Sequence, residues 1–477
     1  MAQLDRGESM LIGWASRDTT PPRPVILRGQ FHARISNAVQ DPIIVTALAL
    51  ESGGEQCVMA TADRVGIPTE LLAGVREKIG KLVPDLVPEK LFISATHTHT
   101  APATEDGDWE DMGPEVMKSS EYAAFFVERT AECVAAAWRK RKPGGLAWGC
   151  GQAVVGFNRR QVKLGGASQM YGDTSTDDFA NIEGYEDHGV DMLFTYDAEQ
   201  ALTGMVVNLA CPSQVTESAH FVSADFWHEA RCEIRQRHGE EIFVLPQCSA
   251  AGDQSPHIMW KKGAEARMLR LKGLCEEGED VRMAERVEIG QRIAAAVDEV
   301  LPLAGKEIHT RIDFRHRVAT VELPRRKITA EDVAEAQQEI DGYSAQLEEL
   351  ADRESADPER SRCFGRRRWF RGVIERYELE KRQPTYPMEM HVVRLGDVVF
   401  ATNSFELYLD YGLRMKTRSP ALQTFVVQLT GPGTYLPSGR SVGGGSYGSV
   451  PASNHVGPEG GDLLVEETVK GMRELFG

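Results

Sequence analysis

The chain has 477 residues, a formal net charge of −17 and 42% hydrophobic residues. A chain of this length and composition can bury a large core, which excludes a disordered protein, a collagen-like fibre and a small disulfide scaffold. The acidic balance argues against a nucleic-acid partner, because an acidic surface repels phosphate backbones. We therefore expect a globular protein whose partner is a small-molecule substrate.

The sequence carries no signal for a membrane or for export. No apolar run approaches the ~20 residues of a membrane span, and the first residues lack the charged-then-apolar layout of a secretion signal. The eight cysteines form no CxxC pair, and several lie in apolar runs, which is typical of reduced thiols. These features predict a cytoplasmic protein that binds no membrane. They leave the oligomeric state open, a homo-oligomer included.

Apolar runs and amphipathic segments alternate along the chain. The apolar runs are rich in Val, Ile and Phe and mostly continuous, as in strands covered on both faces. The combination predicts an α/β layered fold with a mixed, largely buried β-sheet flanked by helices. The predicted strands are 42–50, 57–62, 90–96, 205–211, 242–248, 398–403 and 424–430, and the predicted helices are 68–82, 121–140, 223–238 and 283–301.

Residues 325–384 differ in composition and predict a helical hairpin inserted into an α/β domain that spans residues 10–477. Thr329 with Asp332 resembles a capping box, and apolar residues follow at spacings of three and four. A second amphipathic face begins at Trp369. A structural insertion, a subunit contact and a cover over the site are the roles open to this hairpin.

Five of the predicted strands run directly into polar clusters. In open α/β sheets, ligands bind outside the carboxyl ends of the strands, so these clusters could converge on one site. The clusters are Asp63 with Arg64, THTHT (96–100), CPSQ (211–214), GDQSPH (252–257) and NSFE (403–406).

His97 and His99 are two residues apart in a segment that we expect to be extended, so their side chains should point to the same face. Two imidazoles on one side suit a metal such as zinc, or one ligand and one acid/base group. Two histidines that hydrogen-bond a turn are the structural alternative. Glu406 follows a long apolar run, and its carboxylate could complete a metal site or cap a helix.

Three residues of GDQSPH carry chemistry but are too close in sequence for a Ser–His–Asp triad, since their side chains diverge in a turn. The sequence favours Asp253 as a cap of the loop and Ser255 as a substrate contact. Arg159, in FNRRQV (157–162), could clamp a carboxylate or a carbonyl oxygen, and a surface arginine is the alternative.

The segment 431–461 is rich in glycine. It has neither the GK[ST] of a phosphate loop nor the strand-to-helix setting of a dinucleotide fingerprint. An ordered active-site loop and a linker are both compatible with its composition.

The order of these motifs resembles the neutral/alkaline non-lysosomal ceramidase family. The likeness extends over about residues 10–470, and THTH followed by Pro102 and the GD-x-SP pattern are its most specific parts. It implies a zinc-dependent amidohydrolase with a catalytic α/β domain. The motifs are SATHTHTAP (94–102), FNRR (157–160), VSADF (222–226), GDQSP (252–256), FELYLDYGL (405–413), TYLPS (434–438) and GGGSY (443–447).

The resemblance also implies metal ligands. In that family the first histidine of THTH, the glutamate of the strand-end motif and a late tyrosine bind zinc, and these positions are His97, Glu406 and Tyr447 here. A further zinc-binding histidine follows the fourth strand in the family, where this sequence has Pro212. Our first candidate for the missing ligand is His228, at the start of a predicted helix. The other candidates are His188, His220 and His257, and a weak or absent metal site is the alternative.

The remaining roles implied by the resemblance concern catalysis. The second histidine of THTH, His99, would lie beside the metal, and Arg159 would contact the substrate. Ser255 would lie at the scissile bond, and Asp253 of the same motif completes the catalytic set that we expect.

Together these features predict a hydrolase in which a zinc-class metal activates water to cleave an amide, an ester or a lactone of a small polar molecule. An aromatic content of 7% and the absence of an apolar stretch argue against ceramide as its substrate. One alternative is a metalloenzyme acting on a carbohydrate or sugar acid, as an isomerase or glycan hydrolase. The acidic residues Glu183, Glu186, Asp187 and Asp225 would suit such a ligand. The other is a non-catalytic ligand-binding protein.

Overall fold

Eight strands form one mixed sheet through the middle of the molecule. The structure is a computed structural model and describes residues 8–477. In sheet order the strands are β14 (Phe243–Cys248), β12 (Leu202–Leu209), β11 (Gly189–Asp197), β6 (Lys142–Gln152), β1 (Met10–Asp18), β3 (Ile44–Ser52), β4 (Glu55–Ala62) and β5 (Leu91–Ala95).

A second sheet of four strands packs face to face on the first. An apolar layer fills the space between the two sheets, and in it the rings of Phe400 and Phe425 stack with centroids 4.1 Å apart. Trp14 and Leu48 enter this layer from the large sheet. The strands of the second sheet are β16 (Phe314–Pro324), β17 (Thr385–Leu395), β18 (Val398–Thr402) and β20 (Gln423–Val427).

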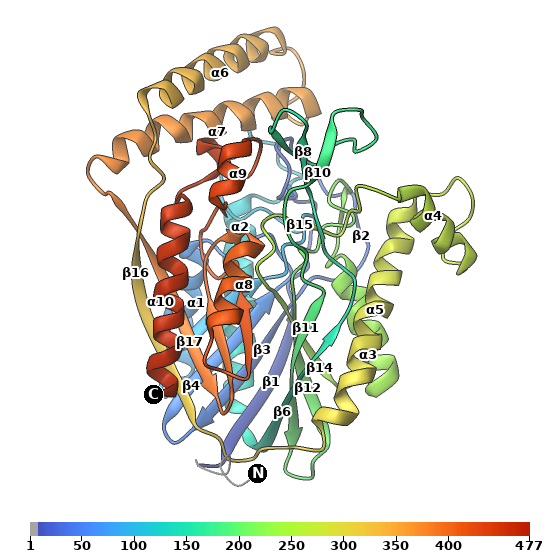
Figure 1. The fold of residues 1–477 in the computed structure, drawn as a ribbon, viewed down its shortest axis with the longest axis vertical. Helices are drawn as coiled ribbons and strands as arrows, with labels where there is room; N and C mark the ends of the chain where they lie inside the picture. The colour runs from blue at the N-terminus through green and yellow to red at the C-terminus, as the bar shows by residue number, and fades with distance from the viewer. Residues whose placement is uncertain (1–7) are drawn as a thin grey trace.

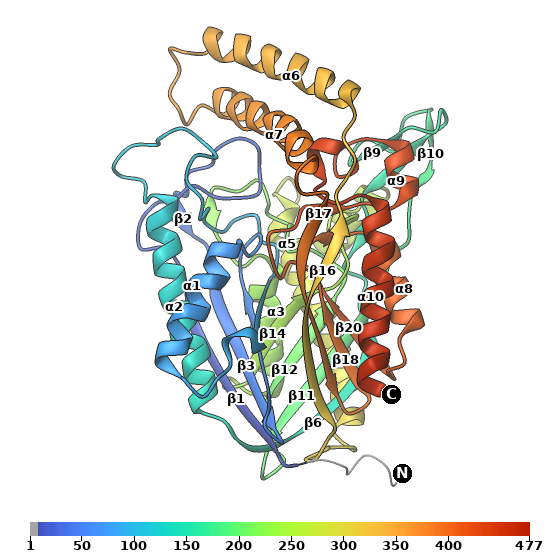
Figure 2. The same ribbon diagram turned by 90° about the vertical axis from the view of Figure 1, so that its left-hand side faces the viewer.

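Helices cover the outer faces of both sheets, so the body has four layers (Figure 2). This arrangement confirms the predicted α/β layered fold, and it explains the continuous apolar runs, because most strands are buried on both faces. Over the large sheet lie α1 (Thr69–Leu82), α2 (Ser119–Arg139), α3 (Phe226–His238) and α5 (Val281–Ala304), and over the small sheet lie α8 (Leu409–Arg418) and α10 (Pro458–Phe476).

All of the predicted strands and helices are present, but the set of predicted strands lacks β6, β11, β16 and β17. β6 contains four glycines in the sequence KPGGLAWGCGQ, and glycine weakens any strand pattern. At Gly144 a Cβ atom would lie 2.3 Å from the carbonyl oxygen of Tyr196, so the close approach of β11 requires glycine there.

All eight cysteines are free thiols. Within residues 8–477, no helix combines the length and the apolar character that crossing a bilayer requires.

The predicted helical hairpin is present and lies across one end of the molecule (Figure 1). It consists of α6 (Ala330–Glu349) and α7 (Pro358–Glu380). Thr329 and Asp332 form the capping box that the sequence indicates, with Asp332 N donating to Thr329 Oγ1 at 3.1 Å. Arg360 of α7 binds Glu110 of the body through two hydrogen bonds of 2.8 and 2.9 Å.

Short elements occupy the loops between the main strands. They are α4 (Lys262–Leu271), α9 (Gly439–Gly444), the 3-10 turns Pro88–Lys90 and Pro451–Ser453, and the strands β2 (Ala38–Val39), β7 (Phe157–Asn158), β8 (Arg160–Lys163), β9 (Ser168–Met170), β10 (Phe179–Ile182), β13 (Phe221–Val222), β15 (Gln254–Ser255), β19 (Glu406–Leu407) and β21 (Tyr435–Leu436).

The contact between α7 and the body leads to a first prediction. A Cβ atom at Gly365 would lie 2.5 Å from the carbonyl oxygen of Phe31, so Gly365→Ala forces the hairpin away from the body. We expect the free energy of unfolding to fall by about 1–3 kcal/mol, measured by urea denaturation.

Gly342→Ala on α6 is the matched control, because a Cβ atom there meets nothing within 4 Å. Alanine is the better helix former by about 0.5–1 kcal/mol, so this variant should gain stability. Equal stability of the two variants would contradict the close packing of α7 on Phe31.

Candidate functional site

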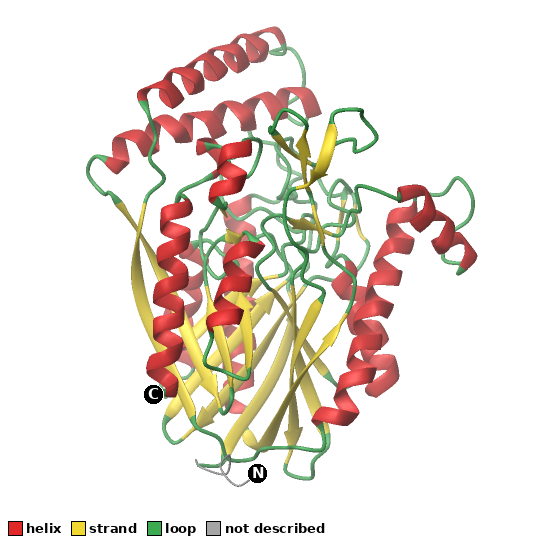
Figure 3. Ribbon diagram, in the orientation of Figure 1, coloured by secondary structure: helices red, strands yellow, loops and turns green. Residues whose placement is uncertain are grey.

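Loops that follow strands of both sheets meet at one end of the molecule, beneath α7 (Figure 3). Ser213 N donates to Thr96 O at 3.1 Å, which joins the loops after β12 and β5. Gly252 N donates to Leu407 O at 2.8 Å, which joins the loop after β14 to β19. The strand-end clusters therefore converge, as the sequence predicts.

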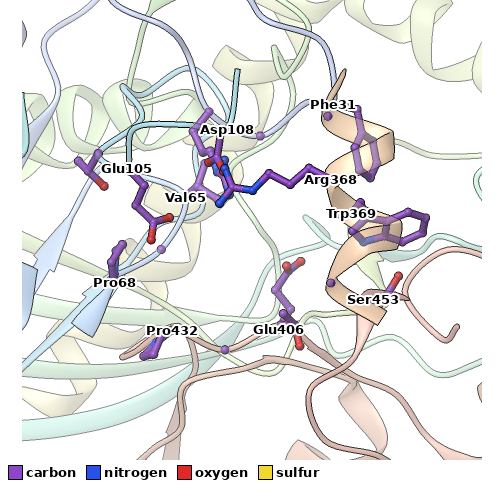
Figure 4. Close-up of a pocket in the computed structure, with 18 of the residues that line it drawn as sticks. Phe31, Val65, Pro68, Glu105, Asp108, Arg368, Trp369, Glu406, Pro432 and Ser453 are labelled. Atoms are coloured by element: carbon purple, nitrogen blue, oxygen red, sulfur yellow. The ribbon is translucent and has the colours of Figure 1, made fainter. Parts of the chain in front are cut away.

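These loops and α7 enclose a cavity of about 940 Å³. Its floor contains His97, His99 and Glu406, and α7 forms its roof. Figure 4 shows Glu406 on the side opposite Arg368, which reaches from α7 to form an ion pair with Asp108. The cavity is the candidate active site.

His97 has a left-handed backbone conformation, with φ at +65°. This conformation is rare outside glycine and is found where surrounding structure enforces it, often at functional sites. His97 N donates to Arg64 O at 2.9 Å, and the Nδ1 atom of its ring lies 2.6 Å from Val65 O. The ring is therefore held with its Nε2 atom toward the cavity floor.

His99 is brought to His97, with 3.4 Å between the two Nε2 atoms. We predicted this proximity from an extended segment in which alternate side chains share a face, and that reason was wrong. The backbone bends at His97, so the segment is not extended there. Gln214 Oε1 accepts from Arg159 Nη1 at 3.3 Å, so its Nε2 atom faces His99 Nε2 at 2.7 Å and donates to it. His99 then carries its own proton on Nδ1, 3.5 Å from Glu217 Oε2.

Burial is the main cause that lowers the pKa of His99 well below its usual range, and the neighbouring charges of His97 and Arg34 lower it further. Sequence reasoning did not single out Gln214 or Glu217. Only their contacts to His99 identify them. From the sequence we considered CPSQ (211–214) because Pro212 replaces a histidine of the family, and we assigned no role to Gln214.

Glu406 provides the carboxylate of the floor. Its Oε2 atom lies 3.3 Å from His97 Nε2 and 4.0 Å from Arg159 Nη2. Burial opposes ionisation of this carboxyl group, but the charges of His97 and Arg159 outweigh it and hold the pKa of Glu406 below its usual value. Glu406 is paired with Tyr435 across the short parallel bridge of β19 and β21, which places a phenol beside the carboxylate.

Tyr447 lies next to Tyr435, with ring centroids 5.4 Å apart. The residue is 37% exposed, and burial of its hydroxyl group followed by the charge of Glu406 raises its pKa to about 12. The buried side chain of Arg160 positions this part of the chain by donating to Gly445 O at 2.7 Å and Tyr447 O at 3.0 Å. The glycine-rich segment 431–461 is thus an ordered part of the site.

The donor atoms on the floor fit a bound cation. With the proton of His97 on Nδ1, the lone pair of Nε2 faces the Glu406 carboxylate, and the two repel unless a cation or proton lies between them. Nitrogen and oxygen donors of this kind suit zinc, and Tyr447 offers a third. In the part of the chain that the structure describes, no three His, Cys, Asp or Glu side chains form a metal-binding group by themselves.

Arg159 is buried and has its hydrogen bonds within the protein. It donates to Tyr171 at 2.9 Å, to Gly252 O at 2.8 Å and to Tyr435 at 3.2 Å, in addition to Gln214. Ser255 lies behind Tyr171, whose hydroxyl group donates to Ser255 Oγ at 3.3 Å. Ser255 is fully buried and is connected to the cavity floor through Tyr171 and Arg159.

Asp253 holds its loop in place through two hydrogen bonds. Its Oδ1 atom accepts from Leu409 N and its Oδ2 atom accepts from Asn158 Nδ2, each at 2.9 Å. Burial is the main cause that raises the pKa of Asp253 to about 6. This geometry agrees with the capping role that the sequence favours for Asp253, and places no reacting group at its carboxylate.

His228 is not brought to the floor. It lies on α3, with Nε2 3.7 Å from the Sγ atom of Cys232, and it does not line the cavity. The reason is that α3 packs on the outer face of the large sheet, so a side chain in the first turn of this helix is carried away from the cavity floor.

The other three candidate histidines also have partners elsewhere. His188 lies beside Glu186 at 3.4 Å, and His220 lies 3.4 Å from Ile35 O. His257 shares a neighbour with His99, because its Nε2 atom lies 3.7 Å from Glu217 Oε1. In the segment around Pro212, Gln214 is the side chain that contacts the histidine pair.

No protein-family model matches this sequence, and no curated protein is detectably similar to it. Solved structures of two ceramidases share its fold. The neutral ceramidase from Pseudomonas aeruginosa superposes with a TM-score of 0.68 at 16% identity, over 98% of this chain and 75% of that one. A ceramidase complexed with C2 superposes with a TM-score of 0.67 at 14% identity, over 98% of this chain and 76% of that one. The resemblance inferred from the motifs is therefore confirmed at the level of the fold, and this chain has the fold of neutral ceramidase with a strongly diverged sequence.

Proposed function

We propose that this protein is a hydrolase that cleaves the amide bond of a small polar molecule. We further propose that a zinc-class metal is held by His97, Glu406 and Tyr447. The observation that carries this proposal is the 3.3 Å approach of His97 Nε2 to Glu406 Oε2 on the floor of a large cavity. The fold, shared with ceramidases, supports it.

In the proposed reaction a water oxygen bonds to the carbonyl carbon, the C–N bond breaks, and a water proton passes to the leaving nitrogen. The products are a carboxylic acid and an amine. A metal ion held on the floor would supply a Lewis acid that lowers the pKa of water toward ~7.

The groups of the chain itself have separate roles in this proposal. Tyr435 and Arg159 place hydrogen-bond donors beside Glu406, where negative charge develops on the carbonyl oxygen. Gln214 holds His99 in one tautomer and orientation, so that His99 can assist proton transfer. Ser255 has an indirect role, because its hydrogen bond fixes the position of Tyr171.

A carbohydrate-acting enzyme is less well supported, because acidic residues that suggested it form ion pairs within the protein. Glu183 forms a buried ion pair with Arg160 at 2.9 Å, and Asp187 binds Lys416 at 3.0 Å. A non-catalytic binding protein stays as the alternative. The next experiment distinguishes it from a hydrolase.

Removing the proposed metal ligands should remove metal and activity together. In His97→Ala and Glu406→Gln we expect loss of bound zinc by elemental analysis. Hydrolysis of a panel of N-acyl amino acids should fall by more than the about 10–100-fold that outer-shell changes cause.

His228→Gln is the control for these variants, because His228 lies on α3 outside the cavity and should keep both metal and rate. If His97→Ala kept full metal occupancy and full rate, the assignment of the floor would be wrong. Stoichiometric metal without turnover of any amide would favour the binding protein.

The two tyrosines should respond differently to loss of their hydroxyl groups. Tyr435→Phe removes a donor beside the reacting carbonyl, so kcat should fall by about 100–1000-fold with little change in zinc content. Tyr447→Phe removes a proposed ligand, so zinc should dissociate at lower chelator concentration. Identical behaviour of both variants in chelator titration and steady-state kinetics would show that these roles are not separate.

A further inference from the structure

The charge of the cavity differs from that of the whole protein. The chain has 54 basic and 71 acidic side chains, yet six arginines and five carboxylates line the cavity. Four of the arginines that line the cavity lie on α7. They are Arg367, Arg368, Arg371 and Arg376, and the other two are Arg28 and Arg64.

The carboxylates compensate little of this charge inside the cavity. Asp108 is shared, because both Arg28 and Arg368 form ion pairs with it. Glu406 is committed to His97 on the floor. The other three carboxylates, Glu70, Glu105 and Glu375, are exposed, so solvent screens them.

Arg64 is a buried guanidinium group on the cavity wall. It donates from Nε to Gly66 O at 2.6 Å and from Nη2 to Thr104 Oγ1 at 2.8 Å, and its Nη1 atom is buried without a hydrogen-bond partner. Its side chain stacks on Phe126 at 4.6 Å. Burial is the main cause that lowers the pKa of Arg64 to about 10. Its side-chain hydrogen bonds within residues 8–477 go to a carbonyl group and a hydroxyl group, not to a carboxylate.

Arg376, on the roof, is partly buried and also has an unpartnered nitrogen atom. It donates from Nη2 to Pro451 O at 3.0 Å and to Ala452 O at 3.3 Å, while its Nε atom is buried without a partner. Burial lowers its pKa to about 10 in spite of the neighbouring Glu375. A buried guanidinium group that binds only neutral carbonyl groups retains its attraction for an anion.

We propose that the part of the cavity between α7 and Arg64 binds an anionic oxygen group of the substrate, a carboxylate or a phosphate, with Arg371 and Arg376 as its contacts on the helix. Guanidinium groups bind both anions through paired hydrogen bonds. The inference rests on the proposed function only in placing the scissile amide at His97 and Glu406. It makes the substrate an amide that carries a negative charge at a distance from the bond that breaks.

Binding tests the inference without turnover. Succinate and inorganic phosphate serve as the two anionic probes and succinamide as the neutral one, each titrated into the full-length protein by calorimetry. We expect at least one anion to bind and succinamide not to bind. The tighter anion distinguishes a carboxylate site from a phosphate site.

Variants on α7 locate the site. Arg376→Gln and the exposed Arg371→Gln should each weaken binding of the preferred anion by about 10-fold or more, as loss of a charged hydrogen bond does. Arg362→Gln is the matched control, since Arg362 is exposed on the same helix and does not line the cavity. Because Arg371 is exposed, its variant should fold even if Arg376→Gln does not.

The outcomes separate this inference from the proposed function. Anion binding that depends on Arg371 and Arg376, without turnover of any amide, would support the anion site and reject the hydrolase. Hydrolysis of N-acetylglutamine as fast as of N-acetylglutamate, with no anion binding, would reject the anion site and support the hydrolase. An equal loss of anion binding in Arg362→Gln would also overturn the inference.

Discussion

Face-to-face packing of the two sheets is the constraint on which the rest of the structure depends. Helices cover the outer faces and an apolar layer fills the space between the sheets, so most strands have no polar face. Polar chemistry is therefore confined to the loops at the strand ends. His97 follows β5 of the large sheet and Glu406 follows β18 of the small sheet, so the floor of the cavity exists only because the two sheets are packed together.

Buried hydrogen bonds then hold the floor in one arrangement. Arg159 connects Gln214, Tyr171 and Tyr435, and through Gln214 it determines which nitrogen of His99 carries the proton. Arg160, the next residue, holds the backbone around Tyr447. Two adjacent arginines at the junction of β7 and β8 thus organise the same site, a role that a pair of surface arginines could not have.

The hairpin covers the cavity and contributes arginine side chains to its lining. α7 packs on the body at Gly365, where only a glycine allows the approach to Phe31. Its arginines face a cavity inside an otherwise acidic protein. Electrostatic potential from such a concave, arginine-lined surface would draw anionic molecules inward while the outer surface repels them.

The sequence by itself determined the layered α/β fold, the helical hairpin and the presence of His97 and Glu406 at strand ends. These features could be predicted because burial on both faces produces long apolar runs, and because a strand that leaves the core must end in polar residues. The glycine-rich β6 was not among the predicted strands, because it is stabilised by the close packing of its neighbours rather than by its own side chains.

Only the tertiary structure decided which side chains meet. Gln214, Tyr435 and the arginines of α7 come from distant segments, and no local pattern distinguishes them from residues that face solvent. His228 had a suitable side chain at a suitable place in the chain, but the packing of α3 on the outer face of the sheet carried it away from the floor. A site is built by contacts between segments, and the energies that choose those contacts belong to the packing of the whole chain rather than to any one segment.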